Sequence, residues 1–365
     1  MHFLDANATQ PLRPEARTAM LAAWDVVGNP SSVHQAGRAA RRVLEDAREA
    51  LAVRFGGRPN GLIFTSGGTE ADALAMHALG AGRQVIVSAI EHDAIRAAVP
   101  EATVLPVRPD GVADLDALDA ILDEDVPSLV CLMLANNETG VVQPVVEAAA
   151  ICRAHAALLH VDAVQGAGRI PVDLTALGAH SIALSSHKLG GPAGIGALLL
   201  ASDAPFASPL IAGGGQELRR RGGTQPVALA AGFAAAAAVR DDPATLAPLR
   251  DAAEAAAVAA GAVVIAGTAP RLPNTTCLAL PGIRADAQVI ALDLEGIAVS
   301  AGAACSSGKV VASHVLQAMG LGSLAGEAIR VSLPWNAAAA DVEAFAAAYL
   351  RTAARLRPAL ASRAA

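Results

Sequence analysis

Short apolar segments alternate with longer amphipathic ones through the first 240 residues of the chain. The apolar segments contain few polar residues and are followed by stretches with helical spacing. Strands that are apolar throughout are buried on both faces, which is typical of a mostly parallel sheet covered by helices. We expect strands at 62–65, 84–87, 129–134, 158–161 and 181–184, and helices at 70–79, 93–99 and 145–156.

The pattern changes after about residue 240. A long amphipathic segment covers 243–260, and later strands and helices come in mixed order, which favours a smaller α+β domain. The last helix is expected to run to about residue 356, with Asn336 as its N-cap. We therefore predict a large domain over 15–242 and a small domain formed by 1–14 and 243–365.

Composition excludes several classes of protein. With 53% hydrophobic residues the 365-residue chain can bury a core, so it is not disordered. Its 27 basic and 34 acidic residues give a net charge of −7, which offers no basic field for nucleic acid or anionic lipid. No apolar run approaches the roughly 18 residues of a membrane span, and neither a signal peptide nor a disulfide framework is evident. We expect a reduced, cytoplasmic protein.

Polar residues follow the expected strands at their carboxyl ends. They lie at 66–69, 91–92, 136–137, Asp162 and 185–188. Ligands of such sheets bind beyond the carboxyl ends of the strands, so these side chains are expected to meet at one site.

Three of these positions carry complementary chemistry. Gly68 and Thr69 begin a helix whose N–H groups can bind a phosphate, although a plain turn is the commoner reading. Asp162 can hold a proton on a heterocyclic nitrogen, or simply cap a helix. Lys188 follows an apolar strand, where desolvation makes an amine nucleophilic toward carbonyls. Together they describe a site for pyridoxal 5′-phosphate, and His92 could stack on its ring.

Cys305 differs from the other cysteines because it lies among small, flexible residues at 300–308. A cysteine on such a loop can move between two positions, and Lys309 would favour its thiolate. Cys131 and Cys277 are typical of core cysteines, and Cys152 with His155 lacks the further ligands of a metal site.

With these residues in view, the chain resembles the cysteine desulfurases, in the class V aminotransferase group of fold-type I pyridoxal-phosphate enzymes. The resemblance runs from residue 4 to about residue 333. It implies a large domain with a mostly parallel seven-stranded sheet and a small domain carrying a mobile cysteine loop at about 300–312. The motifs that carry it are at 28–32, 65–70, 91–92, 136–140, 160–165, 185–192, 221–224, 302–305 and 328–333.

The resemblance also implies roles for individual residues. Lys188 would form the Schiff base, Asp162 would pair with the ring nitrogen, and Gln165 would contact the ring oxygen. His92 would stack on the ring and assist proton transfer. The ring would also be held by Asn137, and the phosphate by Gly68, Thr69, Ser185 and His187 together with Thr224 of a partner subunit, so a homodimer is expected. Arg330 and Asn29 would bind the substrate carboxylate.

The implied reaction removes sulfur from L-cysteine, leaving L-alanine and a persulfide on Cys305. The persulfide would pass to an acceptor protein, for which an iron–sulfur scaffold is one candidate. Two alternatives remain open from the sequence: a selenocysteine lyase or related lyase of the same group, and a non-catalytic scaffold partner with the same fold. No metal, nucleic acid or membrane partner is expected.

Overall fold

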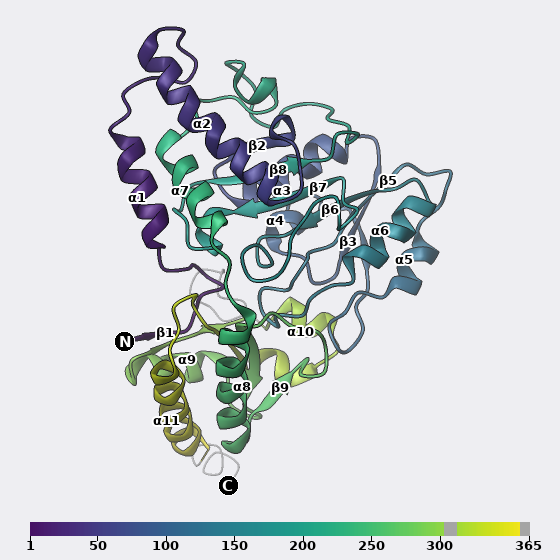
Figure 1. Ribbon diagram of the computed structural model, residues 1–365. Coiled ribbons are helices and arrows are strands. Elements are labelled where there is room, and N and C mark those ends of the chain that lie inside the picture. Colours follow the sequence, from purple (N-terminus) through teal and green to yellow (C-terminus); the bar gives the residue numbers. More distant parts are fainter. Residues whose placement is uncertain (303–311, 358–365) are drawn as a thin grey trace.

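The computed structural model describes residues 1–302 and 312–357 (Figure 1). Its centre is a seven-stranded sheet. In spatial order the strands are β2 (Leu62–Thr65), β8 (Gly196–Leu200), β7 (Ser181–Ser185), β6 (Leu158–Asp162), β5 (Ser128–Cys131), β3 (Gln84–Ser88) and β4 (Thr103–Leu105). Only β8 runs antiparallel to its neighbours, so the prediction of a mostly parallel α/β sheet is confirmed.

Helices cover both faces of this sheet because apolar side chains alternate along each strand. Leu62 and Phe64 point into the larger core, whereas Ile63 between them points into the core on the other face. The larger core is covered by α2 (Gln35–Arg54), α5 (Leu115–Ile121), α6 (Val145–Ala154) and α7 (Val227–Ala238), and the other by α3 (Gly68–Leu79) and α4 (Asp93–Arg96). Helix α1 (Pro14–Trp24) packs outside, against α7.

A second, smaller body lies below the large sheet in Figure 1. It contains the sheet β12 (Ser300–Ala301), β13 (Ala328–Ser332), β10 (Thr275–Ala279) and β9 (Val263–Ile265), and the parallel pair β1 (His2–Phe3) and β11 (Ile297–Ala298). Its helices are α8 (Pro243–Ala259), α9 (Ala285–Leu294), α10 (His314–Ala318) and α11 (Ala339–Leu356). Leu4 shares its core with residues from 246 onward, while the boundary at residue 242 stays a prediction.

The expected N-cap of the last helix is wrong. Helix α11 begins at Ala339, and the Asp341 carboxylate accepts a hydrogen bond from the Ala338 N–H at 2.9 Å. Asn336 lies in a preceding turn, closed by the Ala337 N–H on the Pro334 carbonyl. Pro334 and this turn delay the helix by about one turn.

Short 3₁₀ turns connect several elements, at Pro59–Gly61 (η1), Ser186–Lys188 (η2), Gln216–Arg219 (η3) and Gly322–Gly326 (η4). Among the described residues, no helix combines the length and the apolar character needed to cross a bilayer.

Candidate active site

A cavity of about 330 Å³ opens at the carboxyl ends of β2, β6 and β7, next to the start of β8. Nine of the residues predicted for the cofactor line it together. They are Gly68, Thr69, His92, Asn137, Asp162, Gln165, Ser185, His187 and Lys188. The parallel strands bring them together because their carboxyl ends meet along one edge of the sheet.

The start of α3 forms one wall of the cavity and is open to an anion. Gly67 is its N-cap and has no side chain to satisfy the first N–H groups of the helix. A Cβ on Gly68 would lie 2.8 Å from Val164 Cγ2 and 3.4 Å from Ser185 Cβ, so glycine permits this close packing. Uncapped N–H groups at the start of a 12-residue helix favour a bound phosphate.

Asp162 ends β6 and is buried. Its Oδ1 accepts a hydrogen bond from the Val164 N–H at 2.9 Å, which fixes the direction of the carboxyl group. Burial raises the pKa of Asp162, whereas this hydrogen bond and the nearby His92 and Lys188 oppose that rise. A cationic heterocycle in the cavity would supply a counter-charge for this carboxylate.

Lys188 closes the turn η2 and points its amine toward the N-terminal segment. Its Nζ donates to the carbonyls of Asn7 at 2.6 Å and Ala8 at 2.9 Å. Burial, together with the nearby guanidinium groups of Arg330 and Arg169, lowers the pKa of Lys188 to about 8. The amine is therefore nucleophilic closer to neutral pH than an ordinary lysine.

His92, Gln165 and His187 also line the cavity, and hydrogen bonds within the protein orient their side chains. His92 caps α4 by accepting the Ala94 N–H on Nδ1, which leaves Nε2 to carry the proton. The Gln165 amide donates to the Asn7 carbonyl at 3.0 Å and accepts from Arg169, so one N–H of its amide remains for a ligand. Burial and Lys188 lower the pKa of His187 to about 4, so its ring is neutral.

Arg330 lies beside the cavity on β13 and is buried. Its guanidinium pairs with Asp5 at 2.6 Å and donates to the carbonyl of Asn137 at 3.1 Å. Its Nε is buried with no partner among the described residues, so one donor remains for a substrate carboxylate.

Two predicted residues are not brought to this cavity, and the position of a third is not described. Asn29 lies in the link between α1 and α2, where its side chain accepts the Ser31 N–H, and it does not line the cavity of its own chain. Thr224 is exposed and also lies outside that lining. Cys305 lies outside the described residues. The roles of all three stay predictions.

A buried acidic group in this region was not predicted from the sequence. Asp72 lines the cavity from α3 and meets His160 Nε2 at 3.2 Å, while His160 Nδ1 meets Ser181 Oγ at 2.7 Å. Burial raises the pKa of Asp72 well above its usual value, with Asp162 and Glu91 adding to the rise. Its position in the sequence could have indicated this burial, because Asp72 lies on the same apolar face of α3 as Ala75, Met76 and Leu79.

The chain is similar to known proteins over nearly its whole length. Residues 2–345 match the family described as aminotransferase class-V. The IscS-like cysteine desulfurase of Mycobacterium tuberculosis is 37% identical over 370 residues, covering 94% of each protein. A cysteine desulfurase of Cereibacter sphaeroides is 42% identical and covers 93% of this chain and 92% of its own. The NifS-like protein of Rickettsia africae superposes with a TM-score of 0.89 at 34% identity, over 96% of this chain and 99% of that one.

The chain therefore belongs to the class V aminotransferase family, whose members are pyridoxal-phosphate enzymes. Its full-length similarity to the two curated relatives places it, within that family, among the cysteine desulfurases.

Proposed function

We propose that the chain is a cysteine desulfurase that holds pyridoxal 5′-phosphate in the cavity around Lys188. It converts L-cysteine to L-alanine and passes the sulfur through Cys305. The observation that carries the proposal is the joint placement of Lys188, Asp162 and the uncapped start of α3 in one cavity. Each of the three has an ordinary structural explanation alone, but together they match the three functional groups of one cofactor.

The residues present fit that cofactor. The start of α3, with Thr69 and Ser185, offers donors for the phosphate, and the Asp162 carboxylate suits a protonated ring nitrogen. His92 offers a flat face for the ring, and no Phe, Tyr or Trp is among the described residues that line the cavity. When bound, the cofactor supplies an electron sink that stabilises negative charge developing on the substrate.

Lys188 and Arg330 would have different roles toward the substrate: Lys188 would transfer a proton and Arg330 would bind the carboxylate. A lysine whose pKa is about 8 can take up a proton from the α-carbon of L-cysteine and return it near neutral pH. Arg330, with its free Nε, would bind the carboxylate of the substrate and so fix which bond faces Lys188.

The sulfur transfer balances without an external oxidant. The Cys305 thiolate attacks the substrate sulfur, so that an S–S bond forms while the C–S bond breaks. The released electron pair is protonated at the β-carbon and gives L-alanine. The sulfur leaves the enzyme when an acceptor thiol, on a partner protein or a small molecule, attacks the persulfide.

The proposal includes a homodimer in which Thr224 and Asn29 complete the partner's site, since neither lines the cavity of its own chain. It also places the enzyme in the reducing cytoplasm, because Cys131, Cys152 and Cys277 are free thiols in the structure. The acceptor is expected to be a sulfur-carrying protein, with an iron–sulfur scaffold as one candidate.

The test uses the only two lysines of the chain, Lys188 and Lys309. Lys188→Ala should abolish the visible absorbance of the lysine-linked cofactor, whereas Lys309→Ala should keep it. Cys305→Ser should keep the absorbance but reduce alanine production from L-cysteine to background, with no persulfide detected by mass spectrometry. Alanine release at the wild-type rate by Cys305→Ser would remove Cys305 as the sulfur carrier.

A further inference from the structure

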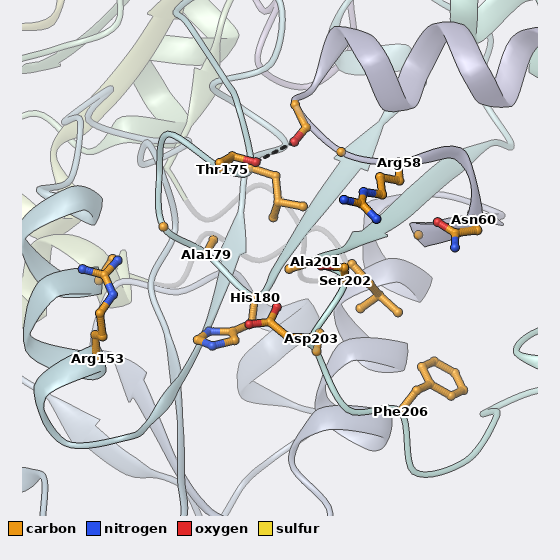
Figure 2. Close-up of a pocket in the computed structure, with 18 of the residues that line it drawn as sticks. Arg58, Asn60, Arg153, Thr175, Ala179, His180, Ala201, Ser202, Asp203 and Phe206 are labelled. Atoms are coloured by element: carbon orange, nitrogen blue, oxygen red, sulfur yellow. Dashed lines mark hydrogen bonds between the residues drawn. The ribbon is translucent and has the colours of Figure 1, made fainter.

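A second and larger cavity, of about 860 Å³, lies at the opposite edge of the large sheet (Figure 2). Strands β2, β6, β7 and β8 separate this second cavity from the cavity around Lys188. Gly61, Ala157 and His180 precede β2, β6 and β7 and line the second cavity, while the carboxyl ends of these strands face the first. Since β7 spans five residues at about 3.3 Å each, the cavities lie about 16 Å apart along the sheet.

Three guanidinium groups line this cavity. Arg220 is held in place by the carbonyls of Glu217 and Asn60, at 3.2 and 2.6 Å. Arg58 and Arg153 make no side-chain hydrogen bond or ion pair within the described part of the chain, and Figure 2 shows them on opposite sides of the cavity. Two guanidinium groups without carboxylate partners, facing one space, favour an anionic ligand.

The space between these two arginines is polar. Figure 2 shows His180 and Asp203 side by side there. His180 Nδ1 accepts the Leu159 N–H at 3.0 Å, and burial lowers the pKa of His180 despite the opposing effect of Asp203. The ring is therefore neutral at pH 7 and carries its proton on Nε2, as a donor.

The local charge is opposite to that of the whole chain. Asp203 lines the cavity, and Asp173 lies against Gly56 at its edge, so three guanidinium groups face two carboxylates. The chain as a whole has a net charge of −7. A locally positive cavity can attract anions even though the net charge of the whole protein is negative.

We propose that this cavity is a second ligand site, which binds a small molecule carrying two anionic groups between Arg58 and Arg153. Its volume lies within the range of small-molecule sites and far exceeds that of a single phosphate or carboxylate. One anionic group pairs with each free guanidinium, and the neutral His180 donates between them. Polycarboxylates and polyphosphates share this chemistry. The site goes beyond the proposed function, because it has no residue in common with the cavity of Lys188.

The test is isothermal titration calorimetry with sodium citrate and with inorganic pyrophosphate, at low ionic strength. The protein is kept saturated with pyridoxal phosphate, so that the start of α3 is not free to bind the probes. The double variant Arg58→Gln with Arg153→Gln should weaken binding at least about tenfold, since hydrogen bonds to charged groups contribute about 1.5–3 kcal/mol each. Each single variant should weaken it in part.

The matched control is Arg108→Gln with Arg284→Gln, which removes the same charge from two exposed arginines outside this cavity. It should leave the affinity unchanged. Tighter binding of citrate would identify carboxylates as the natural anionic groups, and tighter binding of pyrophosphate would identify phosphates. Failure of both probes to bind the wild-type protein would overturn the proposal. So would full binding by the cavity double variant, or an equal loss in the control, which would mark a general charge effect.

Discussion

At the scale of single residues, Lys188 lies where its ammonium form is unfavourable. Burial is the largest cause of its lowered pKa, followed by Arg330 and Arg169, while Asp5 and Asp162 act in the opposite direction. The amine is held by two carbonyl oxygens, which accept hydrogen bonds without adding a negative charge. The protein thus orients the lysine without stabilising its charge as a carboxylate partner would.

Replacing Arg330 with Gln removes a positive neighbour, so the pKa of Lys188 should rise above about 8. Competitive acetylation of the cofactor-free protein at a series of pH values, read by mass spectrometry, measures this because only the neutral amine reacts. Lys309 serves as the reference in the same chain. Arg351→Gln, which changes an exposed arginine paired with Glu295 on the surface, should leave the Lys188 curve in place. An unchanged curve in Arg330→Gln would contradict this origin of the shift.

Glu91 is a second buried group whose charge state the structure controls. Its Oε1 accepts from Ser88 Oγ at 2.6 Å and from the Met133 N–H at 2.7 Å, while Oε2 has no partner among the described residues. Burial raises the pKa of Glu91 to about 8, with Asp162 adding to the rise. The folded protein therefore favours the protonated carboxyl at neutral pH.

This makes stability depend on pH. Because the folded pKa of Glu91 is above its unfolded value of 4.5, its stabilisation is complete below pH 4.5 and is lost as the pH rises to about 8. Glu91→Gln, which cannot ionise, should show a smaller decline of the unfolding temperature over that range than the wild type. The exposed Glu49→Gln is the control. Parallel pH curves for wild type and Glu91→Gln would mean that Glu91 is ionised when folded.

At the scale of elements, the start of α3 shows how one helix can both close a core and present a binding surface. Ala71, Leu74 and Ala75 bury its inner face, whereas its first turn lacks a capping side chain. The loop before it is held by Glu70, which accepts from the Ser66 N–H at 2.7 Å and pairs with Arg221 at 2.8 Å. The N–H groups at the helix start are therefore fixed in place before a ligand arrives.

Gly68→Ala should weaken pyridoxal-phosphate binding about tenfold. The new Cβ would lie 2.8 Å from Val164 Cγ2, so the start of the helix must move. Such overpacking costs about 1–3 kcal/mol. Equilibrium titration by absorbance measures the change. Gly326→Ala, where a Cβ would meet nothing within 4 Å, should bind as the wild type does. Equal affinities for wild type and Gly68→Ala would show that the helix start does not position the phosphate.

The elements differ in how well the sequence predicts them. Strands β2, β6 and β7 were predicted because their continuous apolar runs end in polar residues. Strand β8 is equally apolar but follows a glycine-rich turn and was not expected, so the one antiparallel strand of the sheet came only from the structure. Local patterns indicate burial, whereas strand direction depends on which neighbours pair.

At the scale of the whole molecule, exposed apolar side chains gather on α1 and on the link that follows it. Leu21, Trp24, Val27 and Val33 are each more than half exposed, with Val27 at 82% and Val33 at 83%. The same link contains Asn29, which is one of the residues proposed to serve a partner's site. Exposed apolar groups concentrated on one segment favour association with another surface.

The proposed homodimer predicts a mass of 73 kDa in solution, twice the 36.5 kDa of one chain. Trp24→Asp with Val27→Asp should shift the protein toward 36.5 kDa in light scattering and weaken pyridoxal-phosphate binding, because Thr224 of a partner subunit would be lost. Leu294→Asp, on α9 of the small body and 77% exposed, should remain dimeric. A monomeric wild type that binds the cofactor fully would contradict the partner's contribution.

The sequence by itself determined the class of the sheet, the family and nine of the residues that line one cavity, because strand-end chemistry and motif order are local properties of the chain. The tertiary structure decided which residues far apart in the sequence become neighbours, and no local pattern contains that information. It set Asp72 against His160, placed Arg330 near Lys188 across 142 positions, and left Asn29 outside its own chain's cavity. Charge states follow from such long-range neighbours and from burial, and both arise only when the chain is folded.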